Sequence, residues 1–191
     1  MDGSERKLRD VGELRALAHP VRMRLCQALY ERGTATATEL AEMLGESPAN
    51  CSWHLRQLAK YGFVEEAGGG KGRNRPWRPV ARPLSWGDGD ESGEVAAASD
   101  ALSGQYVEQE FAGLRDWLAW RRTDPPEWQD AANWVQNLDW LTSEELKELN
   151  EALTAIVDRH RERRDPAQRP PGARRVRIFA WAVPAEPYAE D

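Results

Sequence analysis

Hydrogen-bonding and cationic side chains gather on one face of a short predicted helix in the stretch SPANCSWHLRQLAKYG, residues 47–62. Ser47 is suited to cap the first turn, because its hydroxyl accepts from a backbone N–H two or three residues later. Gly62 suits the left-handed position that ends a helix. The opposite face is a narrow apolar stripe at helical spacing, made of Cys51, Leu55 and Leu58. This asymmetry predicts a helix with one buried face and one face able to bind a polar ligand.

The exposed face has the composition that a helix in the major groove of DNA requires. Small or polar residues near the helix start can meet base edges, and cations further along can meet phosphates. The predicted base contacts are Asn50, Ser52 and Arg56, with Trp53 against a sugar or a thymine methyl group. The predicted phosphate contacts are Ser47, Gln57 and Lys60. A solvated surface helix explains this face equally well, so the neighbouring elements decide between the two interpretations.

The preceding elements favour a helix-turn-helix. We expect helices over residues 11–18, capped by Asp10, and 20–32, separated by His19-Pro20 because a residue before proline leaves the α region. A third helix, capped by Thr38, ends at Gly45, one residue before the Ser47 cap. Two short helices joined by a tight turn containing glycine are typical of a helix-turn-helix. Residues 1–9 are polar, and we expect them to be frayed.

A wing follows the second helix of this pair. The stretch 63–67 predicts a strand, residues 68–75 a basic loop, and residues 76–81 a second strand that its prolines restrict to a sheet edge. The wing residues predicted to follow the DNA backbone or enter the minor groove are Lys71, Arg73, Asn74, Arg75 and Arg78. A solvated loop of like charge is the alternative for this segment.

Residues 10–83 resemble ArsR-type winged-helix transcriptional regulators. The resemblance lies in Ala18-His19-Pro20 followed by Arg22, in the pair TELAEMLGESPANCSWHLRQLAKYGFVEE, and in the wing. It implies a homodimer that binds operator DNA beside a promoter, and repression as the usual mode of action.

Charge is distributed unevenly along the 191 residues, whose formal net charge is -6. Residues 1–83 carry 14 Lys and Arg against 10 Asp and Glu, whereas residues 84–160 carry 5 against 17. A basic part followed by an acidic part suggests that DNA contact is confined to the first. The sequence has no apolar run of about 18 residues and no apolar stretch at its start, so we expect a cytoplasmic protein.

The fold class expected for the chain is mainly α with small β (α+β). We predict a winged helix-turn-helix domain over 1–83, a linker over 84–93, and a dimerisation or effector module over 94–191. Within the module we expect a long helix over 94–121, a strand over 134–141, a helix over 143–164 and a strand over 176–183. The pattern describes a small strand-helix-strand unit after a long helix.

Aromatic residues of this module can line a ligand pocket, because such walls are usual for small-molecule sites. A core or a dimer interface explains an aromatic stripe more often. The candidate pocket residues are Tyr106, Trp117, Trp120, Trp134, Trp140 and Trp181.

Catalytic and metal chemistry find little support in the sequence. Cys26 and Cys51 lie on separate predicted helices without the paired spacing of a thiolate site, and His19, His54 and His160 are far apart. We predict that both cysteines pack in the core and that His54 either lies at the core edge or contacts phosphate. GGGKG lacks the following Ser or Thr of a phosphate-binding loop. We therefore expect no enzyme activity, no cofactor and no metal.

The sequence predicts a DNA-binding transcriptional regulator that acts on double-stranded DNA as a homodimer. Two alternatives stay open. One is a protein-interaction adaptor on a winged-helix scaffold, which the modest charge of residues 1–83 would suit. The other is a small-molecule-responsive regulator with an aromatic pocket in residues 94–191.

Overall fold

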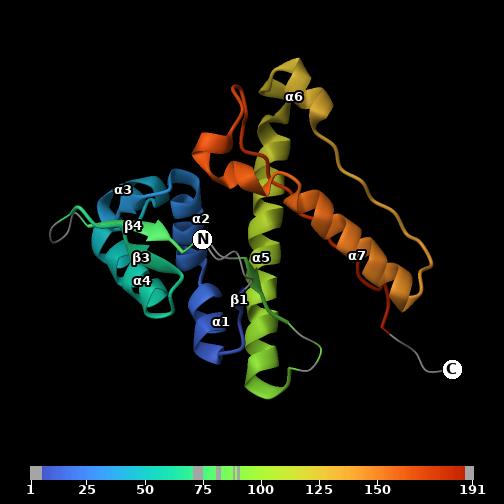
Figure 1. The fold of residues 1–191 in the computed structure, drawn as a ribbon, viewed down its shortest axis with the longest axis horizontal. Coiled ribbons are helices and arrows are strands. Elements are labelled where there is room, and N and C mark those ends of the chain that lie inside the picture. The colour runs from blue at the N-terminus through green and yellow to red at the C-terminus, as the bar shows by residue number, and fades with distance from the viewer. Residues whose placement is uncertain (1–5, 71–74, 81–82, 88, 90, 188–191) are drawn as a thin grey trace. The chain divides into compact units, whose positions relative to one another are not determined.

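The computed structural model describes residues 6–70, 75–80, 83–87, 89 and 91–187. The chain divides into two compact units, residues 1–119 and residues 120–191, whose helices can be followed in Figure 1. Helices dominate and the strands are short, which confirms the predicted fold class. The division lies far beyond the 84–93 segment that composition marks as a linker.

The first two helices begin and end where their capping residues predict. Helix α1 (Val11–Leu17) starts after Asp10, whose side chain accepts from the backbone N–H of Glu13 at 3.0 Å. Helix α2 (Pro20–Arg32) starts after His19, whose Nδ1 accepts from the backbone N–H of Val21 at 3.2 Å. Cap hydrogen bonds of this kind satisfy N–H groups that have no partner inside the helix.

Helix α3 (Ala37–Leu44) has its cap two residues earlier than the predicted Thr38. Thr36 is the cap, because Glu39 stands three residues after it and closes a reciprocal capping box. The third residue after Thr38 is Ala41, which has no group to return the bond. The turn to helix α4 (Pro48–Lys60) passes through Gly45 in the left-handed conformation. The predicted helix-turn-helix pair is confirmed.

A small antiparallel sheet follows α4. Its strands are β2 (Ala35–Thr36), β3 (Val64–Glu66) and β4 (Pro76–Pro79), in the spatial order β2-β4-β3. The expectation that prolines confine β4 to an edge is wrong. Pro76 and Pro79 occupy only its two ends, so the interior pairs Glu65 with Arg78 and Glu66 with Trp77 on one side, and Ala35 with Trp77 on the other.

Two residues of the segment expected to fray, Arg6 and Lys7, pair with two residues of the segment expected to be a linker, Leu84 and Ser85. Strand β1 (Arg6–Lys7) lies parallel to β5 (Leu84–Ser85). The Arg6 guanidinium donates to the carbonyl oxygens of Tyr61 at 2.7 Å and Gly62 at 3.3 Å, and it pairs with Glu13 at 2.6 Å. Arg6 thereby supplies donors to the C-terminal end of α4, where carbonyl groups lack helical partners.

Helix α5 (Gly93–Trp120) belongs to the same unit through its first half. Ala98, Ser99 and Leu102 are buried, and the two apolar ones join the core formed by α1 to α4 and the sheet. Gln109 donates to Gln27 of α2 at 2.6 Å. From Val107 onward the helix exposes more apolar surface, at Val107, Phe111, Leu118 and Trp120.

The second unit holds two helices and extended chain. Helix α6 (Pro126–Ala131) follows a single 3-10 turn (Arg121–Thr123), and helix α7 (Ser143–Asp158) begins with a capping box formed by Thr142 and Glu145. Helix α7 ends before the expected residue 164, and the turns Arg161–Arg164 and Pro166–Gln168 follow it. The predicted strands over 134–141 and 176–183 are wrong for this chain, since both stretches are extended but lie in no sheet among the described residues. The described elements beside them in the chain are helices and 3-10 turns, which have no strand edge with which to pair.

The Arg6 contacts generate a stability prediction. Replacing Arg6 with Ala removes two hydrogen bonds to the end of α4 and one half-buried ion pair, and we expect the free energy of unfolding to fall by about 1–3 kcal/mol. Urea denaturation followed by tryptophan fluorescence measures this loss. The matched control is Arg15→Ala, because Arg15 makes only an exposed ion pair with Glu94 at 3.8 Å. Equal stability of the Arg6 variant and the wild type would contradict the assigned role.

Candidate nucleic-acid interface

Helix α4 separates its two faces as the sequence predicts. Cys51, His54, Leu55 and Leu58 are buried against α2 and α3. Side chains of the opposite face are exposed or half-buried, and Trp53 has 48% of its surface in solvent. Since one face is fixed by packing, the other is held toward solvent at a defined angle.

The polar side chains of the exposed face are oriented before any ligand binds. The Ser47 hydroxyl accepts from the backbone N–H of Asn50 at 3.1 Å, so this hydroxyl serves the helix itself. The Asn50 amide donates to Glu46 at 2.9 Å and keeps its oxygen as an acceptor. Arg56 donates to the Ser52 hydroxyl, one turn earlier, at 2.9 Å. Asn50 and the Ser52–Arg56 pair are thus each oriented by a side-chain hydrogen bond.

Glu46 is a candidate site residue that the sequence analysis did not name. Its carboxylate accepts from Asn50 of α4 and pairs with Arg24 of α2 at 2.6 Å. The Asn50 amide, together with the Arg24 guanidinium, lowers the pKa of Glu46 below its ordinary value. Its position in the turn, four residues before Asn50, was the available signal, because such spacing brings side chains together on one helical face.

The described part of the wing carries its cations in ion pairs. Arg75 pairs with Glu66 at 3.0 Å, and Arg78 pairs with Glu65 at 2.7 Å across β3 and β4. A phosphate that binds either arginine must compete with an adjacent carboxylate. Lys71, Arg73 and Asn74, the other predicted wing contacts, lie outside the described residues.

The remaining predicted phosphate contacts flank the C-terminal half of α4. Lys60 is exposed at the last turn, with its ammonium group 5.2 Å from the centroid of the Tyr61 ring. Gln57 is half-buried on the preceding turn. Both are placed where a phosphate could approach the helix from its C-terminal end.

Two histidine rings lie in contact, tilted relative to each other, behind the exposed face. The rings of His19 and His54 lie 4.6 Å apart, and Trp53 meets His54 edge-on at 4.7 Å. His54 is only 4% exposed and its Nδ1 is without a hydrogen-bond partner in the described structure, which places it in the core rather than at a phosphate. Burial lowers the pKa of both imidazoles, and the nearby Arg22 lowers each further.

The two cysteines are packing residues. Cys51 is fully buried, and burial raises the pKa of both thiols, that of Cys26 to about 12. No group of three potential metal ligands occurs among the described residues.

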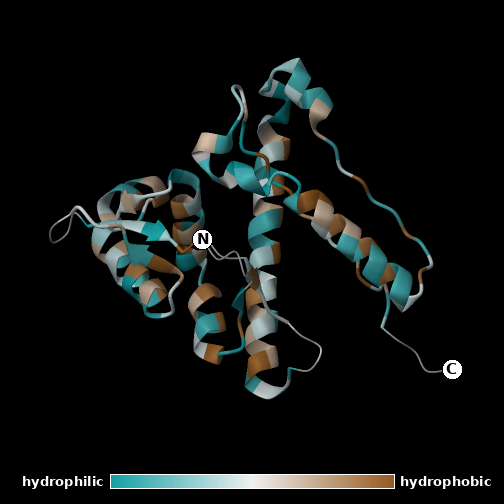
Figure 2. Cartoon of the chain, in the orientation of Figure 1, coloured by the Kyte–Doolittle hydropathy of each residue, from teal (hydrophilic) through white to brown (hydrophobic). Residues whose placement is uncertain are grey.

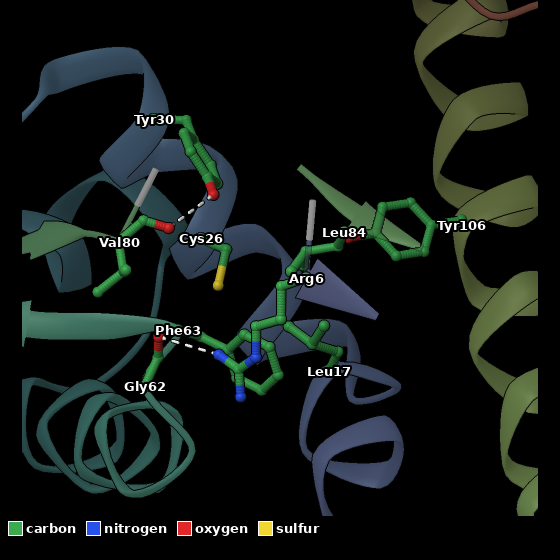
Figure 3. Close-up of a pocket in the computed structure, with 9 residues that line it drawn as sticks. All are labelled: Arg6, Leu17, Cys26, Tyr30, Gly62, Phe63, Val80, Leu84 and Tyr106. Carbon is green, nitrogen blue, oxygen red and sulfur yellow. Dashed lines mark hydrogen bonds between the residues drawn. The ribbon is translucent and has the colours of Figure 1, made fainter. Parts of the chain in front are cut away.

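A small cleft lies on the other side of the winged helix, against α5. Figure 3 shows the Arg6 guanidinium crossing it near the Phe63 ring, at 4.8 Å, with Cys26 and Tyr106 on its walls. Burial raises the pKa of the Tyr106 phenol to about 12.

Tyr106 is the one member of the predicted aromatic pocket that lines this cleft. Trp117 and Trp120 lie further along α5, and Trp120 is 43% exposed. Trp134, Trp140 and Trp181 belong to the second unit, where each has well over half of its surface in solvent. The structure does not gather the six residues around a cavity.

A family model described as a helix-turn-helix domain matches residues 17–67, which run from the end of α1 to β3. No curated protein matches the chain. The matched segment contains α3, α4 and the buried stripe that orients α4. Residues 17–67 are thus similar to a helix-turn-helix domain, the non-enzymatic module found in DNA-binding transcriptional regulators.

Among the described residues, no helix is both long and apolar enough to cross a membrane.

The histidine pair generates a pH prediction. Because folding lowers the pKa of His19 and His54 below 6.5, the unfolded chain takes up protons first as the pH falls. The stability contributed by the neutral rings is complete above about pH 7.5 and is lost as the pH falls through 6.5. Thermal unfolding followed by circular dichroism should show a lower midpoint at pH 5.5 than at pH 8.

The matched variants for this test are His19→Asn and His160→Asn. Asparagine can replace the His19 cap without titrating, so the first variant should lose less stability on acidification than the wild type. His160 is exposed in the second unit, and its replacement controls for the loss of one histidine side chain. A wild-type midpoint that is constant over this range would contradict the prediction.

Proposed function

We propose that this chain is a DNA-binding transcriptional regulator of the ArsR type, which binds operator DNA as a homodimer and represses transcription. The observation that supports it best is the exposed side of α4, where one side-chain hydrogen bond orients Asn50 and another joins Arg56 to Ser52. A recognition helix in the major groove needs polar side chains of this kind, because asparagine and arginine can pair with base edges.

The homodimer follows from the size of the reading surface. One exposed helical face with a short wing contacts a single half-site, and two copies related by a twofold axis read two half-sites about 34 Å apart. Repression follows where the operator overlaps the promoter, since a bound dimer excludes the polymerase.

A protein-interaction adaptor is the second candidate function, and the wing favours it. Arg75 and Arg78 already pair with Glu66 and Glu65, which reduces the positive field that attracts DNA. An adaptor would bind neither specific nor random duplex DNA, so one binding measurement distinguishes the two candidates.

That measurement is fluorescence anisotropy with a duplex from the region upstream of the chain's own gene. We expect the affinity to fall about 100-fold or more between 50 and 200 mM salt, because several phosphates release counterions on binding. A scrambled duplex of equal composition should bind more weakly at each salt concentration. Absence of binding, or an affinity that does not change with salt, would refute the proposal.

Arg56→Ala tests the reading face directly. We expect the preference for the upstream duplex over the scrambled one to fall about tenfold or more, because a base-reading arginine contributes roughly 1–3 kcal/mol of discrimination. The control is Arg15→Ala, which removes the same charge from α1. Arg56 does not read bases if Arg56→Ala, like Arg15→Ala, lowers the affinities for the upstream duplex and for the scrambled duplex by the same factor.

A further inference from the structure

Glu46 lies in the turn between α3 and α4, the two helices of the helix-turn-helix. Both helices carry hydrophilic as well as hydrophobic residues, as Figure 2 shows. The Glu46 carboxylate has both of its oxygens bound. Its Oε1 pairs with the Arg24 guanidinium at 2.6 Å, and its Oε2 accepts from the Asn50 amide nitrogen at 2.9 Å. A carboxylate held at both oxygens has little freedom to turn.

Arg24 fixes the side of this carboxylate that faces α2. Its Nη1 also donates to the carbonyl oxygen of Leu44, the last residue of α3, at 3.1 Å. Its neighbours in α2, Met23 and Leu25, are buried, so the backbone that carries Arg24 is held by the core. A guanidinium group has donors and no acceptor, so whatever faces it at position 46 must offer an oxygen.

The carboxylate determines which way round the Asn50 amide is held. An ionised carboxylate only accepts hydrogen bonds, so the amide turns its nitrogen toward Glu46 and its oxygen away. The bond from Asn50 and the pair with Arg24 lower the pKa of Glu46, which keeps the carboxylate ionised at neutral pH. The Asn50 amide then offers one acceptor oxygen and one further N–H group, near the start of α4, where a recognition helix meets base edges.

One acceptor beside one donor is the complement of adenine. In the major groove adenine presents its N6 amino group, a donor, beside N7, an acceptor, whereas guanine presents two acceptors, O6 and N7. An amide held with its oxygen outward therefore repels guanine O6. An asparagine free to rotate would not exclude guanine, because it could turn its N–H groups outward instead.

We propose that Asn50 reads an adenine in each half-site and that Glu46 is the positioning residue that selects adenine over guanine. The inference rests on the proposed function for DNA binding, and it adds the base and the residue that sets the preference. Glu46 acts through Asn50 and needs no contact of its own with the DNA.

Two binding steps with the full chain test the inference. Selection of a duplex library with a randomised central segment by the wild-type chain first gives the half-site sequence. Fluorescence anisotropy with each base pair changed in turn then compares the wild type with Asn50→Ala. We expect this variant to lose discrimination at one A·T pair, where the wild type prefers adenine over guanine by about tenfold or more.

Glu46→Gln is the decisive variant, because it keeps the shape of the side chain. Arg24 still requires an oxygen, so the new amide turns its oxygen to Arg24 and its nitrogen to Asn50. Asn50 must then turn its own oxygen inward and present its N–H groups to the DNA. We expect the preference at the same base pair to shift from adenine toward guanine by about tenfold or more. Glu46→Ala, which leaves the Asn50 amide free to rotate, should lower the adenine preference by about fivefold.

Glu42→Gln is the matched control, since it removes the same charge from an exposed position on α3. It should change the affinity for all duplexes by a similar factor and leave the preference for adenine unchanged. The Asn50→Ala comparison needs no Glu46 variant, so it tests the choice of base even if the Glu46 variants do not fold, which circular dichroism detects.

The outcomes separate this inference from the proposed function. A wild-type chain that selects no DNA sequence would overturn both. A wild-type chain that selects a site, but in which Asn50→Ala affects no A·T pair, would overturn this inference alone. The same conclusion follows if folded Glu46→Gln and Glu46→Ala keep the wild-type preference, as Glu42→Gln should.

Discussion

The burial of one face of α4 is the constraint on which the candidate interface depends. Leu55 and Leu58 are inaccessible to solvent, and rotating the helix about its axis would expose them. A fully buried leucine contributes roughly 1.5–3 kcal/mol, so the helix has one stable orientation. The polar side chains outside this buried face are positioned by the packing, and the Arg6 bonds to Tyr61 and Gly62 hold the C-terminal end of the helix in place.

Arginine side chains of the winged helix are paired with glutamates. Acidic partners stand beside its cations at Glu46, Glu65 and Glu66. Exposed pairs of this kind contribute little to stability, generally under about 1 kcal/mol. They do hold long side chains in preferred positions, and they weaken attraction to any polyanion. These pairs lower non-specific affinity for DNA and hold the arginines in place, so they are compatible with both candidate functions.

The two units differ in how far they bury their apolar residues. Residues from α1 to the first half of α5 form a continuous core, in which Leu8, Leu14, Leu25 and Leu102 are inaccessible to solvent. In the second unit α7 leaves Ile156 more than half exposed, and the flanking stretches leave Trp140 almost fully exposed. A unit this small buries a modest fraction of its surface alone, and assembly is the usual way in which such units gain the rest.

Local chemistry in the sequence determined most of the first unit. Ser47, Asp10 and Gly45 mark helix ends through bonds and conformations that involve only near neighbours, so they could be recognised without a structure. The split between the two faces of α4 follows equally from helical periodicity. The Thr36 cap could have been found by the same reasoning, because its partner Glu39 is three residues away.

Tertiary structure alone decided the long-range contacts. Arg6 reaches residues 55 and 56 positions away, and nothing in the sequence RKLR marks it as a partner for the end of α4. The same holds for the pairing of β1 with β5 and for the contact between Glu46 and Arg24 of α2. Residues 176–183 show the opposite case, in which a clear pattern in the sequence predicted a strand that the structure does not form. Composition favours a strand there, but a strand also needs a neighbouring edge, and only packing decides whether a chain supplies one.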